Sequence, residues 1–285
     1  MTVPGYHRPA TVDEAVAVLA GTDGARCLAG GATLVAMMNA NLAEPKALVS
    51  LAGIAELAGI AASPGGGFRI GAMTRHRDTA NEARLTGTLS VLRNAARQIA
   101  NPPVRNMGTI GGSIAFADPA ADYPPALVAA EAEIEIAGPA GRRRIPAEAF
   151  FVDWYATALG PGELVIAVHL PPPRPGAGLY RKFARVAGDF AIVSVALAAA
   201  RREGGHSVRV AIGGCGPKPI HLAEVDAMLG ESFGKPEIAR KAGERLAAAS
   251  DPVDDTRATA EYRRLLLPRL LADTIAEAET LLETK

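Results

Sequence analysis

Cysteine is scarce in this sequence. Only two of the 285 residues are cysteine, Cys27 and Cys215, and they lie far apart in apolar or glycine-rich surroundings. A disulfide between them is not expected in a reducing compartment. Two thiols are also too few to hold an iron–sulfur cluster or a structural zinc ion, so both kinds of centre are excluded for this chain.

An excess of charge of one sign is missing as well. Lysine plus arginine number 30 and aspartate plus glutamate number 30, so no net field would draw the chain to nucleic acid or to an acidic membrane. No apolar run reaches the length of a membrane span, and the N-terminus lacks the basic-then-apolar pattern of a signal peptide. We therefore expect a cytoplasmic protein that neither binds nucleic acid nor spans a membrane.

The motifs of hydrolytic and metal-dependent catalysis are absent too. The chain has no G-x-S-x-G and no H-E-x-x-H, no G-x-G-x-x-G follows a predicted strand, and no glycine spacing fits a P-loop. The five histidines are scattered without metal-ligand spacing, which favours surface or hydrogen-bonded structural roles. We predict neither catalytic residues nor a metal site in this chain.

Glycine, by contrast, stands in two informative places. The first follows the segment Ala25–Ala29, which is predicted to be a short buried strand. Gly30-Gly31 would then turn the chain into a helix over Thr33–Met38. A glycine turn between a strand and a helix N-terminus is an anion site, because unpaired N–H groups and the helix dipole point outward. Two adjacent glycines are, however, more often only a tight turn.

The second place is the stretch from Asn101 to Asp122. Pro102-Pro103 are predicted to end a preceding helix, since proline lacks the N–H donor and clashes with the preceding turn. Gly108 and Gly111-Gly112 allow backbone angles and close approaches that a Cβ would forbid. Asp118-Pro119 is typical of a helix start. We therefore expect an open loop between two helices, whose peptide N–H groups converge on a phosphate.

Length and periodicity predict an α+β fold of two or three lobes rather than one core. Strands separated by helices make the first part a small α/β lobe, and a lobe of mixed sheet and helices follows up to a proline-rich linker. An antiparallel three-stranded sheet and a helix bundle are predicted to complete the chain. The expected domains are residues 1–57, 58–177 and 178–285. Because each of the first two carries one glycine segment, we expect a ligand clamped between them.

Two segments resemble the FAD loops of the flavoprotein (medium) subunit of molybdenum hydroxylases, the family of xanthine dehydrogenase and carbon monoxide dehydrogenase. They are Ala29-Gly-Gly-Ala-Thr-Leu34 and Thr109-Ile-Gly-Gly-Ser-Ile-Ala-Phe-Ala-Asp-Pro-Ala-Ala-Asp122. Tyr6-His-Arg-Pro-Ala-Thr-Val-Asp-Glu-Ala15 and Lys182-Phe-Ala-Arg-Val-Ala-Gly-Asp-Phe-Ala191 are similar to that family as well, in the same order. The resemblance covers nearly the whole chain and implies a non-covalently bound FAD.

Two departures from the family pattern affect what can be expected. Ala32-Thr33 stand where CO-oxidising members usually carry His-Ser, which argues against carbon monoxide as the substrate. Ser113 stands where many members have Asn, a change that keeps a short polar side chain. Beside the second glycine segment, Arg105 and Asn106 could reach a phosphate or could fix the loop through hydrogen bonds to its carbonyls.

The resemblance also implies a set of cofactor-binding residues. They are Cys27, Leu28, Ala29, Gly30, Gly31, Ala32, Thr33, Leu34, Ile99, Thr109, Ile110, Gly111, Gly112, Ser113, Asp122, Val165 and Lys182. Asp122, which has no evident structural task, would bind hydroxyls of the FAD sugar or ribityl chain, whereas Asp118 is better explained as a helix cap. Lys182 would contact the flavin, although sequence alone favours a solvated strand lysine. For Ile99 and Val165, core packing is the stronger explanation.

By resemblance, the chain is the FAD-binding electron-transfer subunit of a multi-subunit molybdenum hydroxylase. A large molybdopterin subunit would oxidise the substrate, and a small subunit with two [2Fe-2S] clusters would relay electrons. FAD on this chain would pass them to NAD, a quinone or oxygen, within a dimer of heterotrimers. Two alternatives stay open: a self-sufficient flavin oxidoreductase acting directly on a small organic substrate, and a non-redox assembly protein whose glycine segments are only turns.

Overall fold

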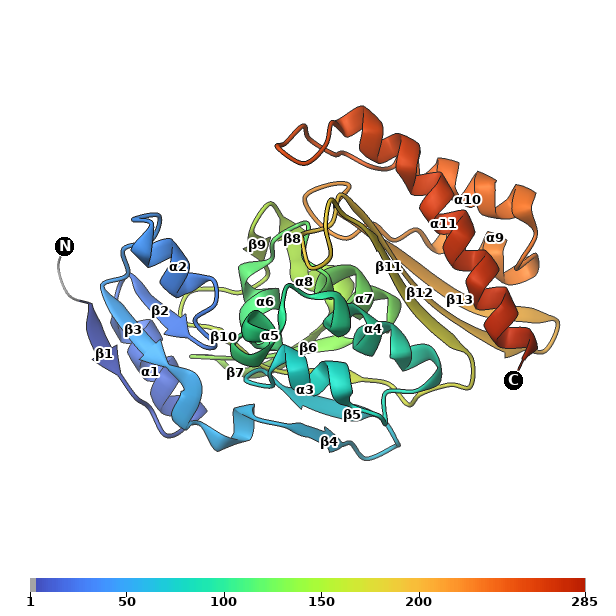
Figure 1. Ribbon diagram of the computed structural model, residues 1–285. Helices are drawn as coiled ribbons and strands as arrows, with labels where there is room; N and C mark the ends of the chain where they lie inside the picture. The colour runs from blue at the N-terminus through green and yellow to red at the C-terminus, as the bar shows by residue number, and fades with distance from the viewer. Residues whose placement is uncertain (1–3, 285) are drawn as a thin grey trace.

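The computed structural model describes residues 4–284 as an elongated α+β molecule (Figure 1). Its larger sheets follow one another along the length of the molecule, with the N-terminal segment at one end and the C-terminal helices at the other. A small parallel sheet comes first, a five-stranded sheet lies in the middle, and a three-stranded antiparallel sheet comes last. This arrangement confirms the predicted fold class and the predicted order of its parts.

The N-terminal sheet is parallel, with strand order β1-β3-β2. Its elements are β1 (Gly5–His7), α1 (Val12–Gly21), β2 (Ala25–Leu28), α2 (Leu34–Asn39) and β3 (Ala47–Ser50), followed by the 3-10 helices η1 (Leu51–Gly53) and η2 (Ala55–Leu57). Helix α1 begins where the Thr11 hydroxyl accepts a hydrogen bond from the amide of Glu14 at 3.2 Å. The small core of this lobe also contains Leu164 and Ile166 of the next sheet, so the two lobes share buried surface.

The middle sheet has strand order β4-β5-β10-β6-β7, and its neighbouring strands run antiparallel. Its strands are β4 (Ile60–Ala62), β5 (Phe68–Gly71), β6 (Glu133–Gly138), β7 (Gly141–Pro146) and β10 (Leu164–Leu170). The associated helices are α3 (His76–Asn81), η3 (Gly87–Leu89), α4 (Ser90–Gln98), α5 (Pro102–Met107), α6 (Ile110–Phe116), α7 (Tyr123–Ala129) and α8 (Ala147–Phe150). Strand β8 (Phe151–Asp153) pairs with β9 (Ala156–Thr157) in a separate hairpin.

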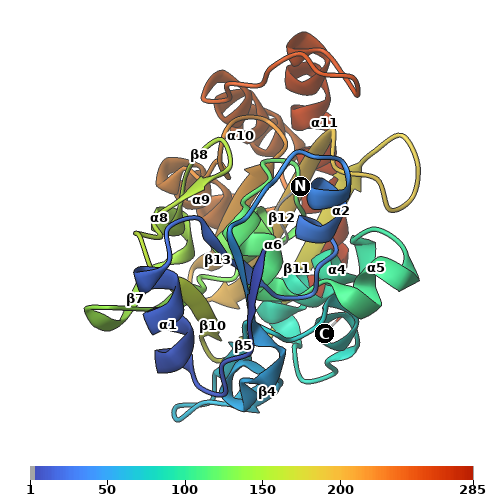
Figure 2. The same cartoon turned by 90° about the vertical axis from the view of Figure 1, so that its left-hand side faces the viewer.

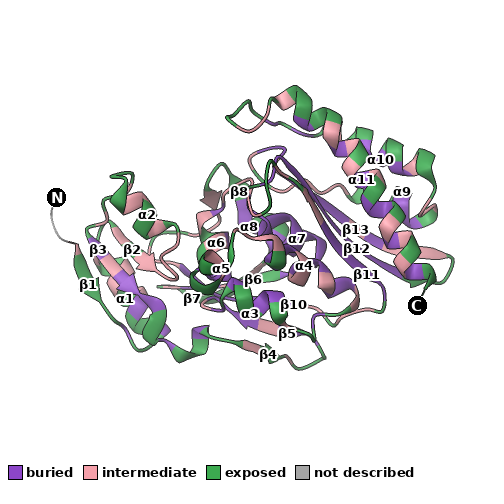
Figure 3. Ribbon diagram, in the orientation of Figure 1, coloured by how far each residue is buried: buried purple, intermediate pink, exposed green. Residues whose placement is uncertain are grey.

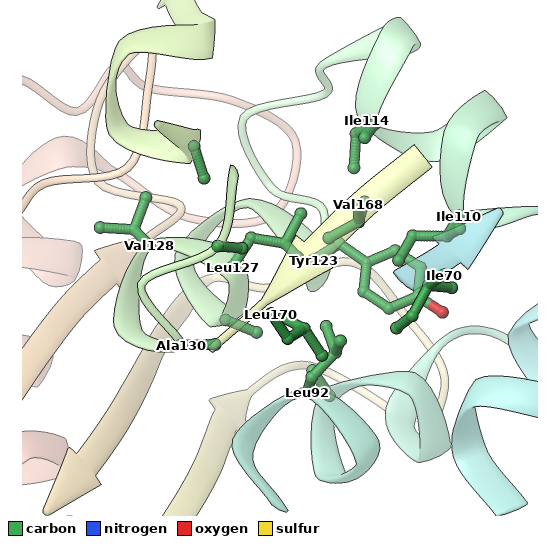
Figure 4. Close-up of a cluster of buried hydrophobic side chains, with 14 of the residues drawn as sticks. Ile70, Leu92, Ile110, Ile114, Tyr123, Leu127, Val128, Ala130, Val168 and Leu170 are labelled. Carbon is green, nitrogen blue, oxygen red and sulfur yellow. The ribbon is translucent and has the colours of Figure 1, made fainter. Parts of the chain in front are cut away.

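The largest hydrophobic core lies between this sheet and its helices. Ile134 and Ile136, at alternate positions of β6, point into it. Strand β10 is buried along nearly its whole length, because the N-terminal lobe covers part of its other face. Figure 4 shows the ring of Tyr123, from α7, close to Ile70 and Ile110 within this core. Burial of α7 is complete from Tyr123 to Ala129, which places the segment directly before it, ending at Asp122, at the edge of the core.

The C-terminal part is a meander of β11 (Ala177–Phe183), β12 (Val193–Arg202) and β13 (Gly205–Gly213), with α9 (Ala223–Glu231), α10 (Pro236–Ala248) and α11 (Ala260–Glu283). Its sheet packs between α4 and α7 on one face and the C-terminal helices on the other. Figure 3 accordingly shows β12 buried along most of its length. Ala196 of β12 lies in the core of the middle lobe, whereas its neighbours Val195 and Leu197 lie in the core beneath the C-terminal helices. The two faces of β12 therefore belong to two cores, which joins this sheet to the middle lobe.

Candidate functional site

The second glycine segment is largely helical, and the prediction of an open loop there is wrong. Helix α5 begins after Asn101, whose side chain accepts a hydrogen bond from the amide of Val104 at 3.0 Å. Pro102-Pro103 occupy its first turn, where a missing N–H costs nothing, so the prolines start a helix as well as following one. Helix α6 begins after Thr109, whose hydroxyl accepts a hydrogen bond from the amide of Gly112 at 3.2 Å.

The two glycines in the first turn of α6 have different tasks. Gly111 is buried, its amide donates to the carbonyl of Ala72 at 2.8 Å, and a Cβ on it would lie 2.5 Å from that of Ala72. Its small size therefore serves packing against Ala72, the residue that follows β5. Gly112 is exposed, and a Cβ on it would lie 3.5 Å from the Cβ of Ala29 in the first glycine segment. Only Gly112 faces the junction between the lobes.

The fold brings the two glycine segments together at that junction. A Cβ on Gly30 would overlap the carbonyl oxygen of Met107 and lie 2.9 Å from the Cα of Gly108. Gly31 has φ +75°, a left-handed conformation that side chains with a Cβ rarely adopt. Figure 2, which views the molecule from the N-terminal end, shows α2 in front of α6. The two glycine segments therefore contact each other directly at the junction between the lobes.

The amides of the two segments differ in whether they are available to a ligand. In α6 the amides of Ile110, Gly111 and Gly112 all donate to protein acceptors, so they cannot converge on a phosphate as predicted. In the first segment, no acceptor within residues 4–284 takes a hydrogen bond from the amides of Ala32 or Thr33. The Thr33 hydroxyl does not cap α2 either. This run of free donors beside a glycine turn fits an anionic group such as a pyrophosphate.

A second set of predicted residues meets at the other end of α6. The Asp122 carboxylate is buried, its Oδ1 lies 2.9 Å from Lys182 Nζ, and the same oxygen accepts a hydrogen bond from the Tyr180 hydroxyl at 2.7 Å. Asp122 therefore does have a structural task, contrary to expectation. Burial raises the pKa of its carboxyl, while Lys182 and the Tyr180 hydroxyl act in the opposite direction. Within the described chain, no hydrogen bond or ion pair involves its Oδ2.

Asp118 does not cap a helix. Helix α7 begins at Tyr123, four residues after the Asp118-Pro119 pair that was expected to start it. The Asp118 side chain instead accepts a hydrogen bond from the amide of Ala120 at 2.9 Å, which stabilises a turn between α6 and α7. Partial burial raises the pKa of its carboxyl.

Lys182 is not the solvated strand lysine that sequence alone favours. Its side chain is 4% exposed, and Nζ donates to the carbonyl of Gln98 at 3.0 Å in addition to pairing with Asp122. An ammonium group has three N–H donors, so one stays available for a further acceptor. Ala100, two residues after Gln98, has an unfavourable φ of +41°. Its carbonyl oxygen would lie 2.5 Å from a Cβ on Gly188. A strained backbone therefore borders this lysine.

The remaining predicted residues fall into two groups. Arg105 donates to the carbonyls of Ile99 and Ala100 at 2.7 and 2.9 Å, so it fixes the backbone directly before the second glycine segment rather than the carbonyls of that segment. Ile99 is half-buried beside Lys182, whereas Val165 is buried within the main core. The others belong to the two glycine segments: Cys27, Leu28, Ala29, Gly30, Gly31, Ala32, Thr33 and Leu34 run from the end of β2 to the start of α2, and Thr109, Ile110, Gly111, Gly112 and Ser113 form the cap and first turn of α6. Burial raises the pKa of the Cys27 thiol to about 12, which favours its neutral form.

His76 supports the junction and was not singled out by its sequence pattern. Its amide donates to the carbonyl of Gly108 at 3.0 Å, and its ring occupies the space that a Cβ on Gly108 would need. Its Nδ1 lies 3.3 Å from the Tyr123 hydroxyl. Burial, together with the charge of Arg105, lowers the pKa of the ring to about 4. A lone histidine between polar residues carries no local signal of such a contact.

Comparison with known proteins agrees with this geometry. Residues 2–173 match the family described as the FAD binding domain in molybdopterin dehydrogenase, and residues 178–278 match the CO dehydrogenase flavoprotein C-terminal domain. The chain belongs to the FAD-binding medium subunits of molybdenum hydroxylases. FAD is therefore its cofactor, and the chain is the flavoprotein component of an oxidoreductase.

Individual members of the family resemble the chain along nearly its whole length. The carbon monoxide dehydrogenase medium chain of Hydrogenophaga pseudoflava is 36% identical and covers 93% of each chain. The nicotine 6-hydroxylase medium subunit of Paenarthrobacter nicotinovorans is 33% identical over 96% of each. Among solved structures, carbon monoxide dehydrogenase from H. pseudoflava lacking the Mo-pyranopterin moiety superposes with a TM-score of 0.93 at 33% identity, over 99% of this chain and 100% of that one.

Proposed function

We propose that this medium subunit binds FAD across the junction between residues 1–57 and 58–177 and transfers electrons from a partner subunit to an external acceptor. The observation that supports this most directly is the close approach of Gly30 to Met107 and Gly108, beside the free amides of Ala32 and Thr33. An extended dinucleotide that lies along this junction can contact both lobes at once. We propose that the three parts 1–57, 58–177 and 178–285 act as separate functional units around it.

The two groups of residues would hold opposite ends of the cofactor. The amides at Ala32 and Thr33 and the open surface above Gly112 suit the pyrophosphate. The third N–H of Lys182 suits an acceptor on the flavin, and Oδ2 of Asp122 suits a hydroxyl of the ribityl chain. Asp122 would thus have two roles, because its Oδ1 orients Lys182 and Tyr180 while its Oδ2 faces the ligand.

The chemistry required of the protein itself is modest. Bound FAD supplies exchange of one or two electrons, so it can link one-electron carriers to a two-electron acceptor. The chain contributes binding and orientation, and the Lys182 charge beside the ring would stabilise negative charge there. No acid or base is needed for such a role, which agrees with the absence of a catalytic motif.

The electron donor and the acceptor lie outside this chain in the proposal. We propose two partners, a large molybdopterin subunit and a small subunit with two [2Fe-2S] clusters, assembled as a dimer of heterotrimers in the cytoplasm. The relatives that support this are medium chains and subunits of such enzymes. NAD, a quinone or oxygen would accept the electrons. Among residues 4–284 no helix is long and apolar enough to cross a membrane.

The experiment compares the isolated chain with the reconstituted complex. The isolated chain should purify yellow, with about one FAD per chain by the family assignment. Its flavin absorbance should be bleached by a chemical reductant but by no organic substrate until both partner subunits are added. Turnover of an organic substrate by the isolated chain, at a rate comparable with the complex, would favour the self-sufficient oxidoreductase. A colourless protein that takes up no FAD would favour an assembly role.

A further inference from the structure

Several large apolar side chains are exposed at one place where the middle and C-terminal parts of the molecule meet. Trp154 is 40% exposed and Tyr155 is 57% exposed, at the turn between β8 and β9. Phe190, just before β12, is 42% exposed, and Val253, between α10 and α11, is 50% exposed. We refer to these four residues as the aromatic patch. In Figure 1 the start of α11 lies at the top of the molecule, above the β8–β9 hairpin.

The aromatic patch is continuous although its residues come from three segments. Trp154, Tyr155 and Val253 border one hollow, together with the side chain of Arg257. The guanidinium of Arg257 in turn lies over the ring of Phe190, at 5.2 Å from its centroid. The Arg257 side chain therefore lies between the aromatic residues of the β8–β9 turn and Phe190, and it makes them one surface.

The position of Tyr155 is held by specific contacts. Its φ is +52°, a conformation that is unfavourable for a residue with a ring side chain. The ring packs edge-on against Phe116, the last residue of α6, at a centroid distance of 5.3 Å, and its hydroxyl hydrogen-bonds to Asp118. Tyr155 is thus held in a strained backbone conformation by specific contacts and is still largely exposed. This combination indicates a surface that contacts another molecule.

The charges beneath the aromatic patch neutralise one another. Asp255 lies 2.6 Å from Arg263 and 3.1 Å from Arg257, and Asp118 lines the same hollow, so two carboxyl groups stand against the two arginines. Apolar and aromatic groups with little net charge are the composition of the central part of a stable protein interface. This composition does not suit a nucleic acid or an anionic lipid surface.

The position of the aromatic patch indicates which partner covers it. The turn beneath it is tied to the C-terminal sheet, since the amide of Ala191 donates to Ala120 at 3.3 Å and that of Gly214 donates to Pro119 at 3.0 Å. Two residues after Ala120, Asp122 holds Lys182 at the end of the site assigned to the flavin. Only a short turn of the chain therefore separates the aromatic patch from the flavin end of the site.

We propose that the aromatic patch docks the iron–sulfur subunit, a proposal that rests on the function proposed above. Electrons cross an interface only where two cofactors come close, so the subunit that carries the clusters must cover the surface beside the flavin. The molybdopterin subunit has no such requirement, because its electrons leave through the clusters. A second copy of this chain would bring two flavins together without supplying an electron donor.

The test uses the medium subunit co-expressed with both partner subunits. In the double variant, Trp154→Gln is combined with Tyr155→Asn, because asparagine tolerates a positive φ and should leave the hairpin intact. Tyr6→Ser is the control, since Tyr6 is also 57% exposed but lies on β1 at the other end of the molecule. Val253→Glu is a second variant that adds a charge to the aromatic patch without altering the hairpin.

Each variant is scored for melting temperature, FAD content and co-purification of each partner. We expect both patch variants to keep FAD and melting temperature but to retain the iron–sulfur subunit at least tenfold less than wild type, whereas Tyr6→Ser assembles normally. Unchanged assembly of both patch variants would overturn the proposal. So would loss of the molybdopterin subunit alone, or loss of self-association in place of heteromeric assembly. If the proposed function itself fails, wild-type chain lacks FAD, which is scored independently of co-purification.

Discussion

Replacing Gly30 by alanine tests whether the contact between the lobes creates the FAD site. The added methyl group would overlap the Met107 carbonyl oxygen and lie 2.8 Å from its carbonyl carbon and 2.9 Å from the Cα of Gly108. Carbon atoms in contact normally lie about 3.5–4.0 Å apart, so the two backbones must separate by roughly 1 Å. Both sides of the contact are backbone, and neither can move away by changing a rotamer.

The cost can be estimated from what overpacking does in protein interiors. Inserting a methyl group where no space exists costs about 1–3 kcal/mol. If FAD requires the original spacing, the same free energy is lost from binding, which corresponds to roughly a 5- to 140-fold rise in Kd. The melting temperature of the apoprotein should fall less, because the two lobes can separate slightly when no cofactor bridges them.

Titration of the apoprotein with FAD, followed by flavin fluorescence, gives Kd for wild type and variant. Gly21→Ala is the matched control, because Gly21 lies in the same lobe and a Cβ on it would meet nothing within 4 Å. A Gly30→Ala protein that binds FAD within twofold of wild type would refute the reasoning. Equal weakening in Gly21→Ala would show that the effect is not specific to the lobe contact.

Three further predictions concern the residues around this junction. Gly111→Ala should lower the melting temperature even without FAD, because the added Cβ would lie 2.5 Å from that of Ala72. Gly112→Ala should leave the melting temperature of the apoprotein unchanged and weaken FAD binding. Equal melting temperatures of the two apoprotein variants would contradict this. Lys182→Met should lower the free energy of unfolding, measured in urea, by about 3–5 kcal/mol, because it leaves the Asp122 carboxylate buried without its partner. Adding Asp122→Asn to this variant should restore part of the lost stability. A double variant no more stable than Lys182→Met would count against the pair. The free energy of unfolding should fall by roughly 3 kcal/mol between pH 6.5 and pH 4 because of His76. In the unfolded chain this histidine binds a proton at its ordinary pKa, whereas in the folded chain it does so only near pH 4. His76→Phe should lack this component, and identical pH profiles of wild type and variant would exclude it.

Much of the secondary structure could be predicted because its causes are local. Thr11 and Thr259 cap their helices through their own side chains, within three residues of the amides that they bind. The strands of the C-terminal sheet are apolar runs separated by glycine, and this pattern needs no distant partner to be recognised. The resemblance to the medium subunits likewise depended on short segments in the correct order, and family membership confirmed it.

The task of each residue at the site was decided only by tertiary contacts. Gly111 and Gly112 are equivalent in the sequence, but α6 turns one toward Ala72 and the other toward the lobe junction. Lys182 alternates along a strand like a solvated residue, yet α4 covers it and supplies the carbonyl of Gln98. Whether a side chain is buried depends on the element packed above it, which lies tens of residues away in the chain.

The sequence by itself therefore determined the family, the cofactor and the positions of most elements, because repeating apolar patterns and capping residues act over a few residues. Only the tertiary structure decided that Asp122 and Lys182 form a buried pair, that His76 supports Gly108, and that exposed aromatic residues from three segments form one surface. Each of these depends on a distance between segments that no local pattern encodes, because that distance results from the packing of the whole core.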